Sequence, residues 1–444
     1  MHYLKILFLT LTLQFSFVGC GGNNGDNALD FGFNLEDLIV PCNDTNSSSP
    51  LVYPAPITAP SPLLVIQVEF ANETVSDTST AWSEKIFGTT SGTMNNYFNE
   101  VSYGNFQFIK ATESDVTNTG AANDGVMHVT LLTNHPDSGF SDGIHSTLYS
   151  AMGIAALNMD VASYDTDANG HITPDELSVI FIIAGNEDSY SGDNASNGVW
   201  AHKSCLDAPP TVDGVTIMGC ANEGNYAVFG EKHGDHTATI GIIAHELGHA
   251  RFNLPDLYDV SQVGFGIGYF GLMGSGSWSY TGTNEAGSSP SHLTPWSKIF
   301  TGWTIPTDVN TSTDNSLYES SATNYNILKT PICNGKYLLM ENRNNSGFDR
   351  GLEVLDGSYN GGLAIWQIDE TIINNGLPSN SVNIGSNQGV RLIQAAAVTE
   401  SAFSRGNEKN LFYKGNVDLL AKDNTLVHNI SERNSFITLD ILKK

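Results

Sequence analysis

Strand-like and helix-like patterns of apolar residues alternate over the first two thirds of the chain. Continuous apolar runs at 63–70 and 177–184 predict buried strands. Apolar residues recur at helical spacing at 144–159 and at 240–247, which predicts two helices that each present an apolar face. Segment 94–106 predicts a helix, a turn and then a strand. Because strands alternate with helices, we expect a three-layer α/β domain built on a mixed, twisted sheet.

The pattern changes on both sides of this domain. Residues 21–61 are rich in Asn, Asp, Ser, Gly and Pro, which is typical of a linker or a short prosegment. After about residue 305, short strand-like runs separated by Asn, Gly and Ser predict a β-rich C-terminal domain; the runs are 337–341, 362–368, 390–394 and 436–441. We therefore divide the chain into a segment at 21–61, a first domain at 62–305 and a second domain at 306–444.

Residues 1–20 are typical of an export signal. Lys5 precedes an apolar run, Ile6 to Val18, that is too short to span a bilayer comfortably. The run ends at Cys20, after Phe17 in place of the usual Leu, and so resembles a bacterial lipoprotein signal. An ordinary cleaved signal peptide is the alternative. We expect export from a bacterial cell, with a lipid on Cys20 that anchors the protein to the outer membrane or cell surface, or else release as a secreted protein.

The charge of the chain excludes several kinds of partner. Lys plus Arg number 19 and Asp plus Glu number 47, which gives a formal charge of −28. Such a chain is repelled by nucleic acid and by anionic lipid surfaces, so neither is an expected partner. The acidity is compatible with a secreted protein, with a saline environment or with calcium binding.

Four cysteines remain when Cys20 is set aside. In an exported protein they predict two disulfides, with three possible connectivities. The pair Cys205–Cys220 is favoured because it closes a short loop, and Cys42–Cys333 would then join the N-terminal segment to the C-terminal domain. A rival interpretation makes Cys42 an inhibitory zinc ligand in a prosegment.

The most specific chemistry lies in the second predicted helix. His245-Glu246-Leu-Gly-His249 has the zinc-hydrolase spacing, in which two imidazoles four residues apart share one helix face. Glu246 stands beside them, where it can take a proton from a metal-bound water. Asp235, Thr237 or Thr239 is expected to cap this helix, and Pro255 to end it.

A catalytic zinc site needs a third protein ligand and an open position. We expect Asp256 as the third ligand, with Asp259 or a more distant residue as the alternative. Met273 lies downstream in a Gly-rich turn, an arrangement typical of metzincins, where the methionine forms an apolar floor beneath the metal. Four further residues are weaker candidates for the cleft: His202, His233 and His236 as lining residues, and Tyr280 as a hydrogen-bond donor to a reaction oxyanion.

Residues 165–176 match the twelve-residue EF-hand calcium loop. Side-chain oxygens would come from Asp165, Asp167 and Asn169, a backbone carbonyl from His171, and two oxygens from Glu176. Gly170 permits the sharp turn, and Thr173 would act through water. The flanks predict a helix before the loop and a strand after it, so we expect one structural calcium site and not a paired calcium sensor. An acidic turn without metal is the alternative.

At these residues the chain resembles the immune inhibitor A-like family of secreted zinc metalloproteases. The family's zinc helix runs into Leu-Pro-Asp-x-Tyr-Asp, which is similar to Leu254-Pro-Asp-Leu-Tyr-Asp259. The resemblance extends over roughly residues 63 to 400; its other segments are 97–106, 200–202, 296–303, 341–343 and 362–370. It implies a metzincin-like zinc endopeptidase domain at 62–305 that acts on proteins outside the cell.

The chain departs from the family pattern in two segments. Phe252 stands where the family and the metzincins commonly have Gly, and Pro255 stands at the usual ligand position, with one residue inserted before Asp256. Gln367 replaces a His that the family often has in its Trp-x-Ile-Asp segment, which puts any metal role there in doubt.

Together these features predict a monomeric, envelope-anchored zinc endopeptidase with a structural calcium ion and with proteins or peptides as substrates. Two rivals remain: a catalytically silent surface adhesin on the same fold, and a metal-dependent hydrolase of a non-peptide bond. The intact Glu246 argues against the first, because a decayed enzyme is free to lose that residue.

Overall fold

The computed structural model describes residues 35–42, 56–58, 60–137, 142–191, 196–264, 266–357, 359–396 and 405–444. The predicted export signal, Cys20 and most of the 21–61 segment lie outside these residues. Among the helices that are described, none combines the length and the apolar character needed to cross a membrane.

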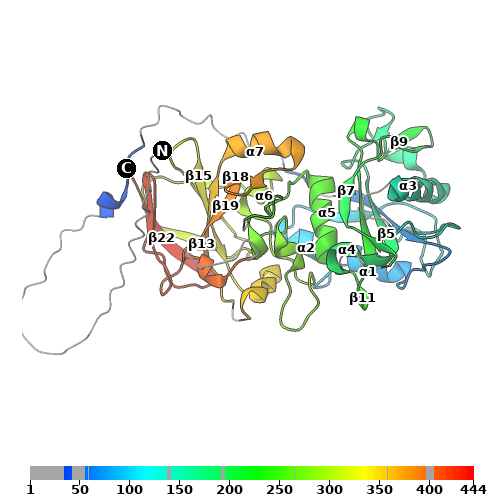
Figure 1. Ribbon diagram of the computed structural model, residues 1–444. Coiled ribbons are helices and arrows are strands. Elements are labelled where there is room, and N and C mark those ends of the chain that lie inside the picture. The colour runs from blue at the N-terminus through cyan, green and yellow to red at the C-terminus, as the bar shows by residue number, and fades with distance from the viewer. Residues whose placement is uncertain are drawn as a thin grey trace, which may run out of the picture.

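A mixed sheet lies at the centre of the N-terminal part of the molecule, residues 61–305 (Figure 1). Its central strand β1 (Ser61–Glu69) is parallel to β5 (Ser178–Glu187) on one side, and β5 is parallel to β10 (Tyr226–His233). The remaining strands are β2 (Phe108–Lys110) and β3 (Val126–Thr130) beside β1, β6 (Gly198–Val199) beside β5, and β7 (His202–Ser204) and β11 (His236–Thr237) antiparallel to β10. The buried strands predicted at 63–70 and 177–184 are thus confirmed.

Helices cover both faces of this sheet because the apolar residues of its strands alternate. Leu64, Ile66 and Val68 pack in the same hydrophobic cluster as α3 (Asp142–Ala155). Leu63 and Val65 pack on the opposite face, with α1 (Ser79–Phe87), α2 (Met94–Val101) and α5 (Ile240–Phe252). Burial of each such side chain contributes roughly 1.5–3 kcal/mol. The predicted three-layer α/β arrangement is confirmed.

The helix predicted at 144–159 ends four residues earlier than expected, at Ala155. Two 3-10 turns follow it, η2 (Ala156–Asn158) and η3 (Val161–Tyr164). The Asp160 side chain accepts a hydrogen bond from the Ser163 N–H and so begins the second turn. Local capping therefore outweighs the apolar spacing at this point.

The C-terminal part consists mainly of strands, as predicted. One sheet has the order β12 (Thr307–Asp308), β14 (Leu328–Pro331), β15 (Tyr337–Arg343), β16 (Gly362–Ile368), β19 (Val390–Ile393). A second sheet has the order β13 (Ser312–Tyr318), β22 (Phe436–Lys443), β21 (Thr425–His428), β20 (Leu420–Lys422). All four strand-like runs noted in the sequence lie on strands.

Short elements connect these larger ones. Small sheets are formed by β4 (His171–Ile172), β9 (Val215–Ile217) and β8 (Thr211–Val212), and by β17 (Asn383–Ile384) and β18 (Asn387–Gln388). The short helices are η1 (Leu35–Leu38), α4 (Asp188–Ser191), η4 (Cys220–Asn222), η5 (Gly268–Phe270), η6 (Ser275–Trp278), α6 (Pro295–Phe300), η7 (Gly347–Leu355), α7 (Glu370–Gly376), η8 (Leu377–Ser379) and η9 (Glu408–Asn410).

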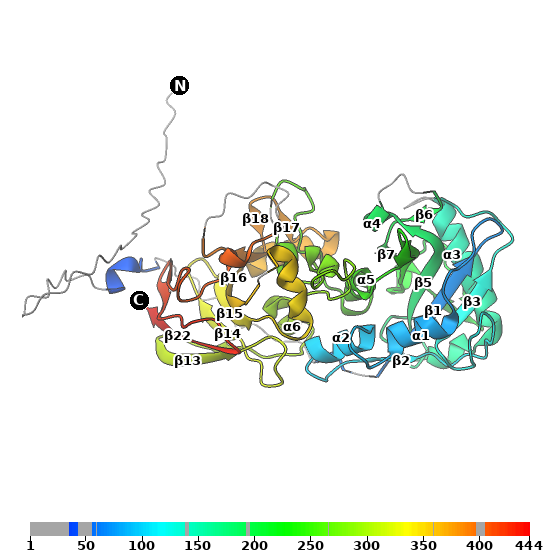
Figure 2. The ribbon, with the colours of Figure 1, turned by 90° about the horizontal axis from the view of Figure 1, so that it is seen from below.

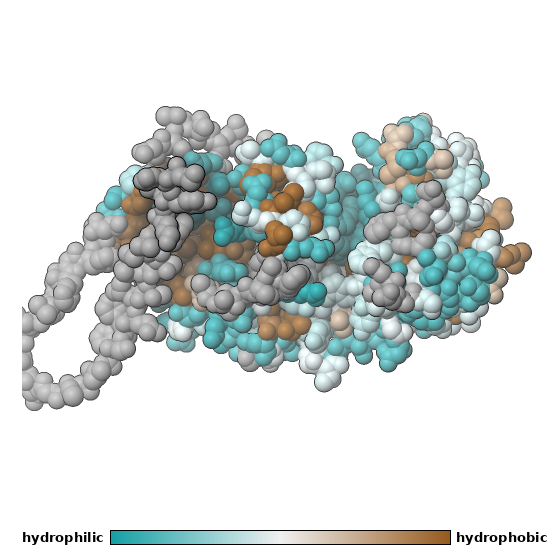
Figure 3. All heavy atoms as spheres, in the orientation of Figure 1, coloured by the Kyte–Doolittle hydropathy of each residue, from teal (hydrophilic) through white to brown (hydrophobic). Residues whose placement is uncertain are grey.

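The two parts share one hydrophobic core. Along β15, Leu338 and Met340 pack with the second C-terminal sheet, whereas Tyr337 and Leu339 pack in the cluster that includes α5 and Met273. Figure 2 shows the C-terminal strands beside α6, with α5 between α6 and the first sheet. The surface is hollowed between the two parts (Figure 3). The boundary at 305/306 therefore marks a change in the sequence pattern, but residues on both sides of it pack in the same hydrophobic core.

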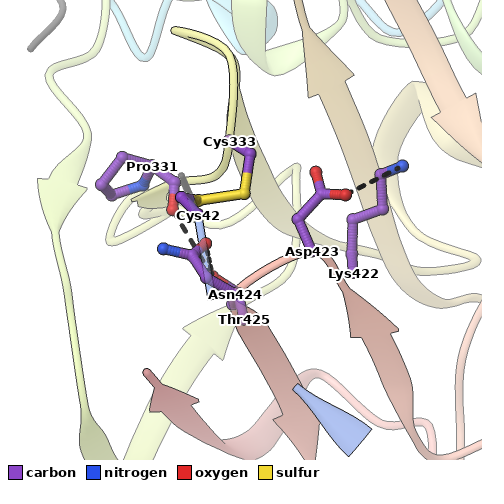
Figure 4. The surroundings of a disulfide bond; sticks show 7 residues. All are labelled: Cys42, Pro331, Cys333, Lys422, Asp423, Asn424 and Thr425. Atoms are coloured by element: carbon purple, nitrogen blue, oxygen red, sulfur yellow. Dashed lines mark hydrogen bonds and ion pairs between the residues drawn. A yellow bond between two sulfur atoms is a disulfide. The ribbon is translucent and has the colours of Figure 1, made fainter. Parts of the chain in front are cut away.

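Both favoured disulfides are present, Cys205–Cys220 and Cys42–Cys333. The second bond fastens the segment 35–42 to the loop between β14 and β15, beside the turn that joins β20 and β21 (Figure 4). Val40 N–H also donates to the Asp423 carbonyl at 2.9 Å. Because its sulfur is bonded to Cys333, Cys42 has no thiolate to offer a metal, and the rival interpretation as an inhibitory ligand is wrong.

Candidate metal centre and active-site cleft

The helix α5 presents the zinc motif. Thr239 occupies its N-cap position, but the hydroxyl donates to the Ala286 carbonyl at 2.7 Å and does not cap the helix. The helix ends at Phe252, because Asn253 adopts a left-handed conformation (φ 54°) and its N–H bonds to the His249 carbonyl. The prediction that Pro255 ends the helix is wrong: the proline lies two residues beyond the cap.

Three ligand atoms converge at one point. Nε2 of His245, Nε2 of His249 and Oδ1 of Asp256 are 3.2 Å apart in each of the three pairs. For a tetrahedral zinc ion with bonds of about 2.0–2.1 Å, the distances between ligand atoms are about 3.3 Å. The expected third ligand, Asp256, is thus placed with the two imidazoles. Asp259 is not: its Oδ1 accepts hydrogen bonds from the N–H groups of Ser261 and Gly385.

The hydrogen bonds of the two imidazoles direct lone pairs at this point. Nδ1 of His245 lies 2.9 Å from the Leu272 carbonyl, and Nδ1 of His249 lies 2.6 Å from the Leu254 carbonyl. A carbonyl only accepts, so in the neutral rings Nδ1 carries the proton and Nε2 a lone pair. Asp256 Oδ1 is buried and has no polar neighbour besides the two imidazoles to donate to it. Three acceptors that face one another in a buried site require a cation, and the donor set N, N, O suits zinc.

The electrostatics of the site favour positive charge between these atoms. Burial lowers the pKa of His245, but hydrogen bonding to Asp256 and the nearby Glu246 carboxylate outweigh it and raise the pKa to about 9. Burial likewise raises the pKa of Asp256, and the two imidazoles overcome this and hold it well below its usual range.

Glu246 lies beside the three ligands and is 5% exposed. Burial raises the pKa of its carboxyl, while His245 and His249 act in the opposite direction and a backbone hydrogen bond from Lys203 also lowers it. A carboxyl group with a raised pKa can exchange protons closer to neutral pH than an ordinary carboxyl group.

Met273 packs against α5, the helix that carries His245 and His249. It is 1% exposed, and a Cβ added at Gly248 would lie 2.6 Å from the Met273 sulfur. The absence of a side chain at Gly248 therefore lets the methionine approach the helix next to His249. The preceding residue, Leu272, supplies the carbonyl that orients His245. The apolar packing expected of Met273 is thus observed.

A cavity of about 1060 Å³ opens over the site. His202 lines it, as expected, but His233, His236 and Tyr280 do not. Tyr280 is held elsewhere, with its N–H bonded to the Gly351 carbonyl. The cavity also contains residues that the sequence reasoning missed: Trp200, Lys203, Tyr258, Trp278, Asn380 and Arg405.

Tyr258, and not the weaker candidate Tyr280, lies beside the metal ligands. Burial and the neighbouring Asp256 carboxylate raise the pKa of its hydroxyl, which stays protonated and able to donate a hydrogen bond. Its position two residues after Asp256 is a signal that was available in the sequence.

The predicted calcium residues lie together in a second cluster. Carboxylate oxygens of Asp165, Asp167 and Glu176 are within 4.8 Å of one another. Asn169 donates to Asp167 at 2.8 Å, and Gly170 has a φ of 83° that suits the sharp turn. His171 begins β4, with its ring beside Asn222 and not among the carboxylates. The expected helix before the loop is α3, which is followed by η2 and η3, and the expected strand after the loop is β5.

Both sites lie in a region that matches a known protein family. The family model of the immune inhibitor A peptidase M6 catalytic domain matches residues 75–305, just over half of the chain. The chain belongs to the immune inhibitor A peptidase family. The resemblance noted from the sequence is thereby confirmed, and with it a metallopeptidase that acts on proteins.

Two crystal structures of wild-type OgpA from Akkermansia muciniphila are similar to this immune inhibitor A peptidase. One is 16% identical, covers 66% of this chain and 73% of that chain, and has a TM-score of 0.28. The other is 14% identical, covers 88% and 93%, and has a TM-score of 0.27. At these scores the likeness carries no argument about the site. A comparison with curated proteins found no match.

The family match ends at residue 305, but residues after 305 also line the cavity of this immune inhibitor A peptidase. Leu377, Pro378, Ser379, Asn380 and Arg405 come from the C-terminal part and line the same cavity as Glu246. The C-terminal part is therefore a wall of the cleft.

Proposed function

We propose that this chain is a zinc-dependent endopeptidase that hydrolyses peptide bonds of extracellular proteins. The observation that carries the proposal is the triangle of His245, His249 and Asp256, with sides of 3.2 Å, beside the buried Glu246 in a metallopeptidase of this family. We further propose that the protein is a monomer tethered to the envelope of a bacterial cell through a lipid on Cys20.

The chemistry follows from the charges around Glu246. A zinc ion bound there would act as a Lewis acid that acidifies water and polarises the scissile carbonyl. Glu246 takes the proton from the attacking water and later delivers it to the leaving amine. The Tyr258 hydroxyl donates a hydrogen bond to the oxygen that gains negative charge.

The position of β7 at the edge of the sheet favours an extended peptide as the substrate. The strand pairs with β10 on one side, and its residues His202 and Lys203 line the cavity next to Glu246. An extended chain can add to such an edge by backbone hydrogen bonds, which hold a peptide of any sequence near the metal.

The proposed activity is tested by cleavage of casein with the chain that lacks residues 1–20. We expect cleavage by the parent, loss of cleavage after chelation, and its return with zinc. His249→Ala should be inactive because it removes a ligand, whereas His428→Ala, a histidine of β21, should retain activity. Equal cleavage by the parent and His249→Ala would contradict a catalytic site at this position.

We also propose that calcium binds at 165–176 and stabilises the zinc helix. The loop is joined to that helix directly, since Arg251 in the last turn of α5 forms an ion pair with Asp175, the residue before Glu176. Arg251 also donates to the Ser61 hydroxyl at 2.9 Å at the start of β1. An ion that fixes Glu176 would therefore hold the end of the zinc helix in place.

Calcium removal is expected to lower the melting temperature of the protein while zinc is retained. A ligand present at 100 times its dissociation constant stabilises the folded state by about 2.7 kcal/mol. The measurement is thermal unfolding with and without calcium in a zinc-containing buffer. Glu176→Gln should abolish the calcium response, and Glu432→Gln, on the loop between β21 and β22, should preserve it. If the melting temperature of the parent protein is the same with and without calcium, the proposed calcium site is wrong.

A further inference from the structure

The segment that carries the third ligand has no regular structure of its own. Residues 254–260 leave α5 without entering another helix or strand, so their polar groups need partners elsewhere. Several of these partners lie in residues 380–385, about 125 positions later in the chain. Asn383 donates to the Leu257 carbonyl at 2.8 Å, and Gly385 N–H donates to Asp259 Oδ1 at 2.9 Å.

Asn380 makes the most direct of these contacts, because it holds Asp256 by two hydrogen bonds. Its Nδ2 donates to Asp256 Oδ2 at 2.6 Å, and its Oδ1 accepts from the Asp256 N–H at 2.7 Å. Asn380 itself is fixed in a left-handed conformation (φ 49°, ψ 42°) directly after η8. Asparagine tolerates this conformation better than most residues.

The two bonds determine which carboxylate oxygen meets the metal. With Oδ2 held by Asn380, Oδ1 is the oxygen directed at the two imidazoles, at 3.2 Å from each Nε2. Without Asn380 the carboxylate loses the hydrogen bond that holds Oδ2, so Oδ1 is directed less strictly at the two imidazoles. Outer partners of metal ligands typically contribute a factor of about 10–100 in metal affinity.

We propose that Asn380 is a positioning residue for the metal centre, so that the zinc site is completed by the C-terminal part, outside the matched catalytic region. This inference rests on the proposed zinc function. It assigns the C-terminal part a role in metal binding, in addition to its role as a wall of the cleft.

The test is the zinc affinity of Asn380→Gly in the chain that lacks residues 1–20, measured by competition with a chromophoric chelator. Glycine keeps the left-handed backbone and removes only the side chain. Asn429→Gly is the matched control. Asn429 also has a positive φ (53°) and also donates to an aspartate, Asp440, at 2.6 Å, but it lies in the loop directly after β21. We expect the zinc dissociation constant to rise by about 10–100-fold in Asn380→Gly and to stay unchanged in Asn429→Gly.

Unfolding of the zinc-free proteins separates positioning from general stability. The two variants should melt alike without zinc, and only Asn380→Gly should gain less from added zinc than the parent. Asn380→Asp is a second variant that keeps the shape but places a carboxylate against Asp256, and we expect it to lose affinity as well. Zinc binding by the parent with equal affinity in all variants would overturn the role of Asn380. A parent that binds no zinc, or a His249→Ala protein that still binds it, would overturn the proposed function and this inference together.

Discussion

Glu246→Gln is expected to bind zinc as the parent does and to lose peptide cleavage by about 10²–10⁴-fold, the usual contribution of a general acid–base group. Glutamine has nearly the same size, so the buried position beside His245 and His249 remains filled. It cannot take a proton from water, however, and both proton transfers of the reaction then lose their catalyst.

The measurement is the rate of casein cleavage at saturating zinc, with the zinc content of each protein determined in parallel. Glu432→Gln is the control for the substitution itself and should cleave at the parent rate. Cleavage by Glu246→Gln at a rate close to that of the parent, with zinc bound, would remove Glu246 from the mechanism.

The second large effect is expected at the junction between the two parts of the molecule. Arg343, at the end of β15, is fully buried and forms ion pairs with Asp349 and Glu341. It also donates to the Phe270 carbonyl at 2.7 Å, three residues before Met273. Asp349 in turn accepts from the His292 N–H at 2.9 Å. These bonds connect the C-terminal part to the chain segment beneath the metal centre.

Arg343→Met is expected to destabilise the folded protein by about 3–5 kcal/mol. Methionine replaces much of the volume but leaves the Asp349 carboxylate buried without its cation and Glu341 with Lys298 alone, and an uncompensated buried charge is costly. The measurement is the midpoint of urea unfolding. Arg433→Met removes a partly exposed pair with Glu408 and should cost less than about 1 kcal/mol. Equal midpoints for the two variants would show that the buried network contributes little.

The sequence predicted best what depends on residues close together in the chain. Helical spacing determines that His245 and His249 share a face, and Asp256 is near enough to return to them after the helix ends. The end of the helix was predicted less well. It was expected at Pro255, but the left-handed conformation of Asn253 already ends the helix at Phe252. Likewise the helical pattern that extends to residue 159 is replaced after Ala155 by two 3-10 turns, the second of which is capped by Asp160.

Apart from the Cys42–Cys333 disulfide, contacts between distant residues left no comparable signal. Asn380 meets Asp256 across 124 positions, and Arg343 reaches Phe270 across 73. A single Asn or Arg in a strand-rich region is most often a surface residue, so only the folded chain reveals these partners. The weaker candidate Tyr280 lies outside the cavity, whereas Tyr258, only two residues after Asp256, lines it.

The most direct test of the central claim is casein cleavage as a function of zinc occupancy. The chain that lacks residues 1–20 is stripped of metal, calcium is restored, and zinc is then added in known amounts. Our account predicts no cleavage by the zinc-free protein and a rise in rate that stops at one zinc ion per chain. Full cleavage by a protein without zinc would contradict it.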